Sequence, residues 1–202
     1  MDWQTTAYAV PDQIPSRVAA AALIQGLTAL AQVTESHYVD KGDTVLIHTV
    51  AGGAGLLHAQ MAKARGATVI GTTSTTEKAE LARAHGADHV ILYKQENTVE
   101  RVLELTSGEG VNVIYDGVGK TTWVFPQHIG MSLIDCSFDD DFKMIKRKGT
   151  IVSFGNASGR VEPVDLLKLT EKNVKLLRPT WVPCVSHTLC APLTRPCFVA
   201  PG

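Results

Sequence analysis

Residues 44–73 read TVLIHTVAGGAGLLHAQMAKARGATVIGTT, and they decide the fold. The apolar, β-branched run at 44–49 predicts a buried strand, and a glycine-rich loop follows it at once. After the loop, residues 56–66 place apolar side chains at helical spacing and end on Gly66, where a helix C-cap belongs. A second β-branched run at 68–73 predicts another strand. The stretch therefore predicts a strand–helix–strand unit with parallel strands.

The same alternation extends in both directions along the chain. Upstream, the Ala- and Leu-rich residues 18–33 predict a helix, and the turn-forming residues 40–43 separate it from the first strand. Downstream, the pattern predicts helices at 75–86, 98–108 and 138–149. It also predicts strands at 89–93, 111–119, 150–155 and 174–179. Strands that alternate with helices of this length, and that are apolar on both faces, predict an α/β fold with a doubly wound parallel sheet.

The composition indicates one globular domain without a strongly charged surface. The chain has 202 residues, of which 45% are hydrophobic, and its 19 basic and 20 acidic residues give a formal net charge of −1. This balance gives no electrostatic footprint for nucleic acid or for an anionic membrane surface. No run of about eighteen apolar residues is present, and the start MDWQTTAYAV lacks the segments of a signal peptide. We therefore expect a cytoplasmic protein with no membrane and no nucleic acid among its partners.

The four cysteines predict neither a disulfide framework nor a metal site. Cys136 stands apart, whereas Cys184, Cys190 and Cys197 lie close to the end of the sequence. In a cytoplasmic setting we expect these cysteines to stay reduced. His187 lies among them, but the spacing matches no zinc motif with short paired ligands, so we expect no metal.

The loop at 50–55 is the first candidate ligand site. Compared with the phosphate-binding pattern G-x-G-x-x-G, it keeps the second and third glycines, Gly52 and Gly55, and has Val50 in place of the first. Gly52 would let the backbone approach a pyrophosphate, and Gly55 would let the helix pack closely on the strand. The helix that starts here also directs free N–H groups and the positive end of its dipole at the loop. The pattern predicts a dinucleotide site; the alternative is a glycine-rich turn that binds no ligand.

The end of the second strand distinguishes between the two nicotinamide dinucleotides. NAD-binding loops carry an Asp or Glu about 20 residues past the glycine loop, but residues 71–74 are Gly-Thr-Thr-Ser. A carboxylate there would repel a 2′-phosphate, so its absence favours NADPH. Lys78 can supply a positive charge to that phosphate while the hydroxyls of Ser74 and Thr75 donate to it. The alternative for Lys78 is an exposed helix lysine beside Glu77.

Several segments resemble a known family in their order and spacing. They are AAALIQGLTAL (20–30), HTVAGGAGLL (48–57), ARAHGADHVI (82–91), YDGVG (115–119) and RKGTIVSFGNASG (147–159). Through them the chain resembles the zinc-free quinone oxidoreductase (zeta-crystallin-like) branch of the medium-chain dehydrogenase/reductase superfamily, most of all its fungal members. The likeness covers about 17–122 and 138–180 and corresponds to the family's cofactor domain, a Rossmann NAD(P)-binding fold.

The resemblance implies an NADPH-dependent oxidoreductase that transfers hydride directly to quinones or enones, without a catalytic zinc and as a homodimer in its full-length form. No side chain is implied as a chemical catalyst, because the cofactor brings the chemistry and the protein positions it. Toward the nicotinamide and its ribose, the family's pattern places Thr28, Gly117, Val118, Gly119, Phe154, Gly155 and Asn156. At the pyrophosphate and the adenosine phosphate, it places Gly52, Gly53, Ala54, Gly55, Ser74, Lys78 and Tyr93.

Three other polar features each have two interpretations. Asp116, at a strand end, is either a turn-former or a neighbour of the ligand. His48 lies on a buried strand beside the loop, where we expect a hydrogen-bonded core histidine rather than a functional group. A basic cluster within 143–148 lies at the end of a predicted helix, where its charge suits the helix dipole. We expect it to be a solvated helix end rather than an RNA site.

The chain departs from the family's pattern in three places. Residues 1–16 are all that could correspond to the family's catalytic GroES-like domain, so we expect that domain to be missing. Residues 123–137 interrupt the cofactor domain at 17–180, and residues 181–202 form a tail without family resemblance. Neither segment has a helical or strand period. We therefore expect 123–137 to loop out of the sheet and the tail to be disordered.

The two unusual segments share their first residues. Each opens on Thr-Trp-Val, at 122–124 and at 180–182. The codons for Trp-Val always contain GT, the dinucleotide with which introns begin, so we hypothesise that both segments are translated introns. The alternative for 123–137 is a natural surface loop. Transcripts that all retain the codons for this segment would contradict the hypothesis.

Three functions remain open on the sequence. The first is NADPH-dependent reduction of quinones or enones. The second is a catalytically inactive nucleotide-binding module, because one wall of the substrate cleft is expected to be missing. The third is enoyl reduction in polyketide or lipid synthesis. The sequence does not separate the first from the third, because most substrate contacts would lie in the missing domain.

Overall fold

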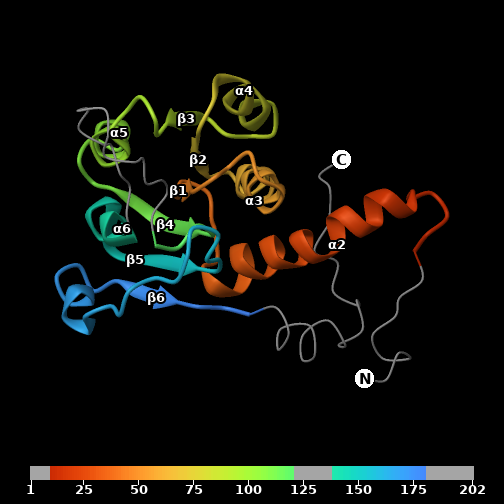
Figure 1. The fold of residues 1–202 in the computed structure, drawn as a ribbon. Coiled ribbons are helices and arrows are strands. Elements are labelled where there is room, and N and C mark those ends of the chain that lie inside the picture. Colours follow the sequence, from red (N-terminus) through yellow and green to blue (C-terminus); the bar gives the residue numbers. More distant parts are fainter. Residues whose placement is uncertain (1–9, 121–137, 181–202) are drawn as a thin grey trace.

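A computed structural model of the chain describes residues 10–120 and 138–180. Within them, parallel strands form one sheet in the order β3-β2-β1-β4-β5-β6, with helices on both faces (Figure 1). The strands are β1 (Thr44–Ile47), β2 (Thr68–Thr73), β3 (His89–Leu92), β4 (Val111–Asp116), β5 (Ile145–Ser153) and β6 (Lys175–Leu177). The helices are α2 (Ser16–Ala31), α3 (Gly53–Ala64), α4 (Thr76–Ala84), α5 (Thr98–Leu105) and α6 (Phe138–Met144), with a π-helical turn η1 (Gln32–Ser36) and a 3-10 turn η2 (Leu166–Leu169). This is a doubly wound α/β sheet, so the predicted fold class is confirmed.

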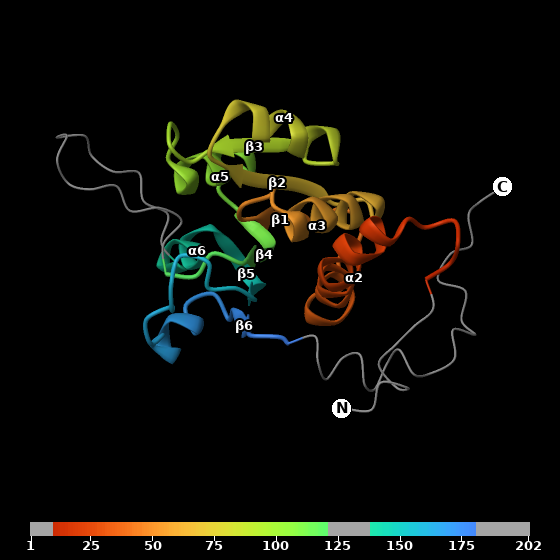
Figure 2. The same ribbon diagram turned by 45° about the vertical axis from the view of Figure 1, so that its right-hand side comes forward.

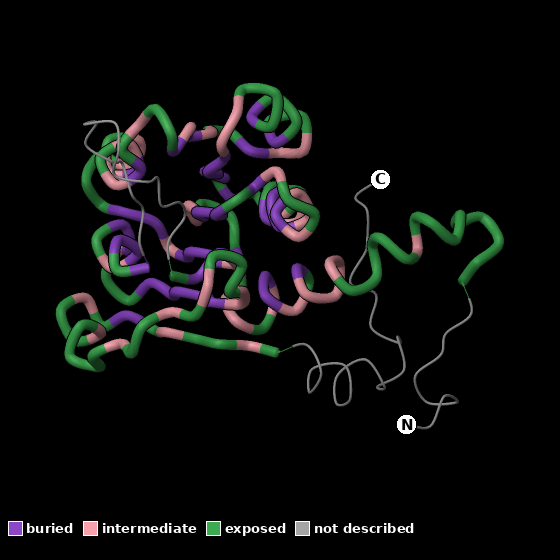
Figure 3. Tube along the Cα trace, in the orientation of Figure 1, coloured by how far each residue is buried: buried purple, intermediate pink, exposed green. Residues whose placement is uncertain are grey.

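The strands contribute alternate side chains to two separate hydrophobic cores. Along β1, Val45 and Ile47 face one core and Leu46 faces the other, as the pleat of a strand requires. Residues of η1, α3 and α4 complete the first core, and residues of α5 and α6 complete the second. Figure 2 shows these two groups of helices on opposite sides of the sheet, and in Figure 3 the buried residues concentrate in the strands. Burial on both faces explains why the strands read as continuous apolar runs.

The strand order reverses at β1, and this reversal positions the site. β1 pairs with β2 on one side and with β4 on the other. The chain runs outward from β1 through β2 to β3, then crosses back to β4 and runs outward in the other direction. Ligands of open α/β sheets bind in the crevice outside the carboxyl ends of the strands at such a point. The glycine loop follows β1 directly and therefore lies in that crevice.

The prediction of a helix over 138–149 is wrong for the second half of that range. Helix α6 stops short, and residues 145–149 belong to β5. Ile145 is fully buried and pairs with Val111, so the sheet uses its apolar side chain. A register shift follows, and Lys148 has a φ of 62°. Most of the basic cluster therefore lies on an irregular part of a strand, and not at a helix end as predicted.

The helix predicted over 18–33 is longer than expected. It continues through η1 as Ser16–Ser36, a stretch of 21 residues that is long and apolar enough to cross a membrane by length and composition alone. Core helices of globular proteins pass the same test. The end of α2 packs on α3, whereas its first turns extend beyond the sheet (Figure 1). Val18, Leu23 and Ile24 on these turns are 48–60% exposed.

The expectations for 123–137 and for 181–202 concern segments that lie outside the described residues. The same holds for the cysteines and for His187. The remaining predicted elements appear in the structure, with their ends moved by a few residues.

Candidate cofactor site

The glycine loop connects β1 to the N-terminus of α3. Thr49 has a φ of 52°, and Gly52 is the N-cap of α3 without a capping side chain from the described residues. A Cβ on Gly55 would lie 2.6 Å from the carbonyl oxygen of Thr49 and 2.7 Å from that of Val50, so only glycine lets α3 pack this close. Gly52 and Gly53 are exposed. The first turn of α3 therefore presents bare backbone to solvent, an arrangement that suits an anion.

Val50, which replaces the first glycine of the pattern, is fully buried against β2. Its N–H donates to the carbonyl of Thr72 over 3.0 Å. A Cβ on Gly71 would clash with the side chain of Val50, so the valine occupies the space that a side chain at position 71 would need. The larger residue in the loop is thus accommodated by a glycine in the neighbouring strand.

Ser74, Thr75, Lys78 and Tyr93 lie beyond the carboxyl ends of β2 and β3. Thr75 is the N-cap of α4, and its Oγ1 accepts from the N–H of Lys78 over 3.4 Å. The N–H of Tyr93 donates to the last carbonyl of β2 over 3.2 Å, and Tyr93 is largely buried. The Lys78 side chain is exposed, and Ser74 is half-buried. Hydrogen bonds from its own N–H and from the Thr75 hydroxyl lower the pKa of Glu77, which thus competes for that hydroxyl.

Two turns lie against each other after β4 and β5. The buried carboxylate of Asp116 accepts hydrogen bonds from the N–H groups of Val118 (2.7 Å) and Gly119 (3.2 Å). Of the two interpretations of Asp116, the structure therefore favours that of a residue that forms the turn. A Cβ on Gly155 would clash with the carbonyl of Gly117, so the two turns touch backbone to backbone. The structure thus brings together the residues that the sequence places toward the nicotinamide ribose and the hydride-transfer face.

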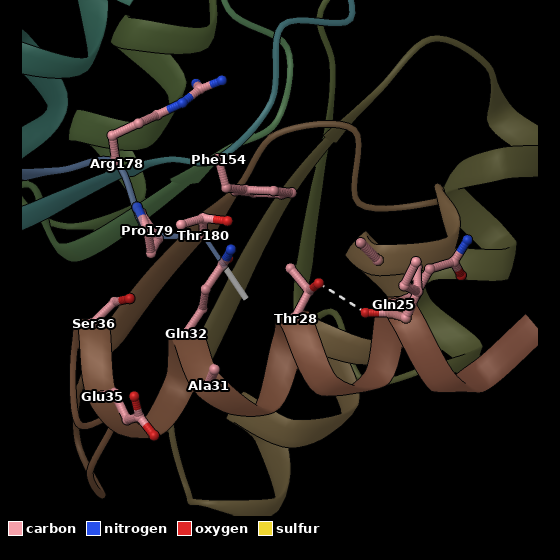
Figure 4. A pocket seen from close by; sticks show the side chains of 12 residues that line it. Gln25, Thr28, Ala31, Gln32, Glu35, Ser36, Phe154, Arg178, Pro179 and Thr180 are labelled. Carbon is pink, nitrogen blue, oxygen red and sulfur yellow. Dashed lines mark hydrogen bonds between the residues drawn. The ribbon is translucent and has the colours of Figure 1, made fainter. Parts of the chain in front are cut away.

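A cavity of about 610 Å³ opens between α2, the start of α3 and the ends of β5 and β6 (Figure 4). Thr28, Ala54 and Phe154, all expected from the sequence, line it. The Thr28 hydroxyl donates to the carbonyl one turn earlier in α2 over 2.8 Å. Gln32 and Arg178 line the cavity as well, although the sequence pattern did not single them out. Of the residues expected at the phosphates, only Ala54 lines this cavity; the others lie outside it: Gly52, Gly53, Gly55, Ser74, Lys78 and Tyr93.

Arg178 joins the segment after β6 to the turn after β5. Its Nη1 donates to the hydroxyl of Ser153 over 2.9 Å and to the carbonyl of Gly155 over 3.0 Å. When the Asn156 amide is turned so that its nitrogen donates to Gly155, its oxygen accepts from Nη2 of Arg178 over 3.2 Å. The position of Arg178 at the carboxyl end of the last strand is the signal that would have found it.

The histidine beside the loop is buried and hydrogen-bonded at both ring nitrogens. Nε2 of His48 lies 2.9 Å from Oδ1 of Asp141 on α6, and Nδ1 lies 3.3 Å from Oγ1 of Thr72. Burial by itself lowers the pKa of His48, but the Asp141 carboxylate outweighs burial and the net pKa is raised. Burial raises the pKa of Asp141 to about 6, against the opposing effect of His48. The expectation of a core histidine is confirmed, and the pair ties α6 to the end of β1.

The described ranges, 10–120 and 138–180, contain no group of three or more His, Cys, Asp or Glu side chains placed to hold a metal ion. They do contain a parallel sheet whose strand order reverses at β1. A glycine loop and an exposed helix N-terminus lie at that point. This combination defines a Rossmann-type nucleotide-binding domain.

Comparison with known proteins narrows this class to a family. Residues 53–125 match the family described as "Zinc-binding dehydrogenase". The chain is 43% identical over 172 residues to a quinone oxidoreductase of Pseudomonas aeruginosa, which covers 85% of this chain and 48% of that protein. It is 38% identical over 172 residues to quinone oxidoreductase 1 of Escherichia coli, with the same coverage of 85% and 48%. The crystal structure of the Escherichia coli quinone oxidoreductase complexed with NADPH superposes with a TM-score of 0.79 at 35% identity, covering 91% of this chain and 52% of that chain.

The chain belongs to the quinone oxidoreductase branch of the medium-chain dehydrogenase/reductase superfamily, and it corresponds to the cofactor domain. It spans about half the length of the curated relatives that it matches.

Proposed function

We propose that this chain binds NADPH and forms the cofactor domain of a zinc-independent oxidoreductase that reduces quinones or enones. The layout of the carboxyl edge of the sheet carries the proposal. A lysine and hydroxyl groups follow β2 without an acid at the strand end, an exposed helix N-terminus follows β1, and the cavity lies at β5 and β6. NADPH is elongated, with its 2′-phosphate near one end and its nicotinamide at the other, so this order of features matches the molecule. Two of the similar solved structures are described as complexes with NADPH.

Each part of this edge would hold one part of the cofactor. Because Gly52 and Gly53 have no side chains and are exposed, a pyrophosphate can reach the N–H groups at the start of α3. Lys78 would pair with the 2′-phosphate, and Thr28 and Phe154 would border the nicotinamide. When bound, NADPH supplies the hydride. The chain's own residues bind and orient the cofactor, and such positioning is the main catalytic contribution expected of a domain of this kind.

The choice of cofactor is the most direct test. Lys78→Ala should weaken NADPH binding by about ten- to a hundredfold, because a hydrogen bond to a charged group contributes roughly 1.5–3 kcal/mol. NADH affinity should stay nearly unchanged, because NADH has no 2′-phosphate. Both affinities are measured by fluorescence titration at low and at high salt. The preference for NADPH should shrink at high salt, since Lys78 is exposed.

Arg83→Ala is the matched control, because it removes a positive charge from the last turn of the same helix, α4. This variant should leave the affinity for both cofactors close to that of the wild type. Equal losses of NADPH and NADH binding in Lys78→Ala would mean that Lys78 supports the fold and not the phosphate.

The substrate class has two candidates, both electron-poor acceptors of hydride. The name quinone oxidoreductase, which two of the relatives carry, supports quinones as the substrate class. A relative named 2-haloacrylate reductase, 38% identical over 146 residues, favours an activated alkene. An enoyl reductase structure at 23% identity supports only the shared fold. Rates of NADPH oxidation with a simple quinone and with a simple enone, measured on a full-length protein that contains this domain, would rank the two.

We also propose that turnover needs more than this domain. The matched region covers only 48% of the relative from Pseudomonas aeruginosa, and α2 exposes Leu23 and Ile24 beside the cavity, which is open to water. A second domain packed there would exclude water and position the substrate. The 202-residue chain alone should bind NADPH but oxidise it slowly with quinones; turnover equal to that of a full-length relative would contradict this. For the full-length protein we infer a location in the cytoplasm. We also infer that it is a homodimer, and size-exclusion chromatography would test this oligomeric state.

A further inference from the structure

A buried histidine lies behind the wall of the cavity. His58 on α3 is fully buried, and its ring lies 4.7 Å from the ring of Tyr115 and 5.4 Å from that of Phe154, centroid to centroid. Nδ1 of His58 lies 2.7 Å from the carbonyl oxygen of Ala54, and Nε2 lies 2.8 Å from Oε1 of the Gln32 side chain. Both of these hydrogen-bond partners, Ala54 and Gln32, line the cavity. The histidine thus connects the start of α3 to the π-helical turn η1.

The partners of His58 fix its tautomer. A backbone carbonyl only accepts hydrogen bonds, so Nδ1 must carry the hydrogen that is donated to Ala54. Burial lowers the pKa of His58 to about 4, so the ring is neutral at pH 7 and Nε2 accepts. Two acceptors, Nε2 and Oε1, would then face each other, so the Gln32 amide must be turned by about 180° for its N–H to donate to Nε2. The oxygen and nitrogen of an amide occupy the same shape, so these partners alone decide which way the amide is turned.

The Gln32 backbone is held as firmly as its side chain. Gln32 begins the π-helical turn η1, and its carbonyl accepts from the N–H of His37 over 3.1 Å and from the hydroxyl of Tyr115 over 3.3 Å. Figure 4 shows the Gln32 side chain pointing from the helix toward Phe154 and Thr180. In the orientation that Figure 4 draws, the amide nitrogen is at the tip of the side chain and Oε1 is the atom at His58. When the amide is turned to suit the tautomer of His58, the oxygen faces the cavity.

We propose that Gln32, oriented by His58, presents its carbonyl oxygen to the cavity and accepts a hydrogen bond from the carboxamide NH2 of the nicotinamide. This inference rests on the proposed function, which places the nicotinamide in the cavity. A carbonyl at this position matches the donor of the carboxamide, whereas an amide turned the other way would meet it with a second donor. Gln32 is then a residue that selects and positions the cofactor, and His58 is a positioning residue that acts through Gln32.

Two cofactors that differ only in the carboxamide test the proposal. In the reduced 3-acetylpyridine analogue of NADPH, a methyl group replaces the NH2. By isothermal titration calorimetry, the wild type should bind NADPH about two- to tenfold more tightly than the analogue, the range expected for one neutral hydrogen bond. Gln32→Leu should bind the two cofactors equally. His58→Leu should lower the ratio as well, because the Gln32 amide is then free to turn.

Two further variants separate this effect from damage to the fold. Gln25→Leu removes another amide from the same cavity wall, one that makes no hydrogen bond to His58. It should change both affinities by one factor and keep their ratio. Gln32→Leu leaves Nε2 of His58 without a donor, so the double variant Gln32→Leu/His58→Leu removes both partners and should fold better while the ratio stays at one.

The outcomes are distinct. A wild type that binds both cofactors equally would overturn the inference, as would a ratio that survives in Gln32→Leu and in the double variant. A wild type that binds no NADPH would refute the proposed function and the inference with it. A wild-type preference that disappears only in the variants of Gln32 and His58 supports both.

Discussion

Substituting Gly55 by alanine should disrupt both the fold and the cofactor loop. The new Cβ would lie 2.6 Å from the carbonyl oxygen of Thr49, 2.7 Å from that of Val50 and 2.8 Å from the Val50 carbonyl carbon. Favourable contacts begin at about 3.5 Å, so these three contacts are roughly 0.7–0.9 Å too short. All three atoms belong to the backbone, and no change of side-chain rotamer can relieve the overlap. Either α3 moves away from the sheet or the loop after β1 changes shape.

The size of the effect follows from this geometry. Inserting a methyl group into a closely packed site costs about 1–3 kcal/mol. For a domain of this size, each kcal/mol lowers Tm by roughly 2–4 °C, so Gly55→Ala should lower Tm by roughly 2–12 °C. Because the loop backbone that approaches the pyrophosphate must move, NADPH affinity should fall by about tenfold or more, which corresponds to at least ~1.4 kcal/mol.

Thermal unfolding by circular dichroism and fluorescence titration with NADPH measure the two effects. Gly26→Ala is the control, and its effect on stability should have the opposite sign. A Cβ at this position in α2 meets nothing within 4 Å. Replacing a glycine inside a helix by alanine should stabilise the chain by about 0.5–1 kcal/mol. A Gly55→Ala variant with wild-type Tm would refute the packing argument. Lower stability with unchanged NADPH affinity would refute the role of the loop in binding the cofactor.

Two further predictions concern groups outside the loop. Folding raises the pKa of Asp141 from 3.8 to about 6 and raises that of His48, so the pair contributes stability at low pH that is lost as the pH rises through these values. Asp141→Asn should therefore flatten the fall of Tm between pH 3.8 and about 6, the range between the ordinary and the folded pKa of Asp141, and an unchanged slope would contradict this. Asn97→Ala removes the acceptor for the N–H groups of Val99 and Glu100 at the start of α5. It should cost about 1 kcal/mol, or roughly 2–4 °C in Tm, without altering NADPH affinity; a loss of affinity would mean that α5 communicates with the site.

The features that the sequence predicts correctly depend on residues close together in the chain. The helix predicted over 75–86 forms as α4 with Thr75 as its N-cap, a position that favours threonine. Gly66 follows α3 with a φ of 85°, a conformation that suits glycine at the end of a helix. The alternation of apolar strands and helices also repeats within a few residues, so the parallel sheet could be predicted without knowledge of any long-range contact.

The features that the sequence misses depend on residues far apart in the chain. The run from residue 138 has helical composition, but Ile145 is withdrawn from the helix because it pairs with Val111 in the sheet. Arg178 joins the site through hydrogen bonds to the turn after β5, which no local pattern reveals.

The sequence by itself determined the order of strands and helices, the glycine loop and the absence of an acid at the end of β2, because backbone propensity and side-chain period are properties of neighbouring residues. The tertiary structure alone decided that Gly71 makes room for Val50, that Asp141 meets His48, and that His58 orients the amide of Gln32. Each of these contacts joins elements separated along the chain. Their energies depend on burial and on which atom faces which, and packing fixes both only when the helices cover the sheet.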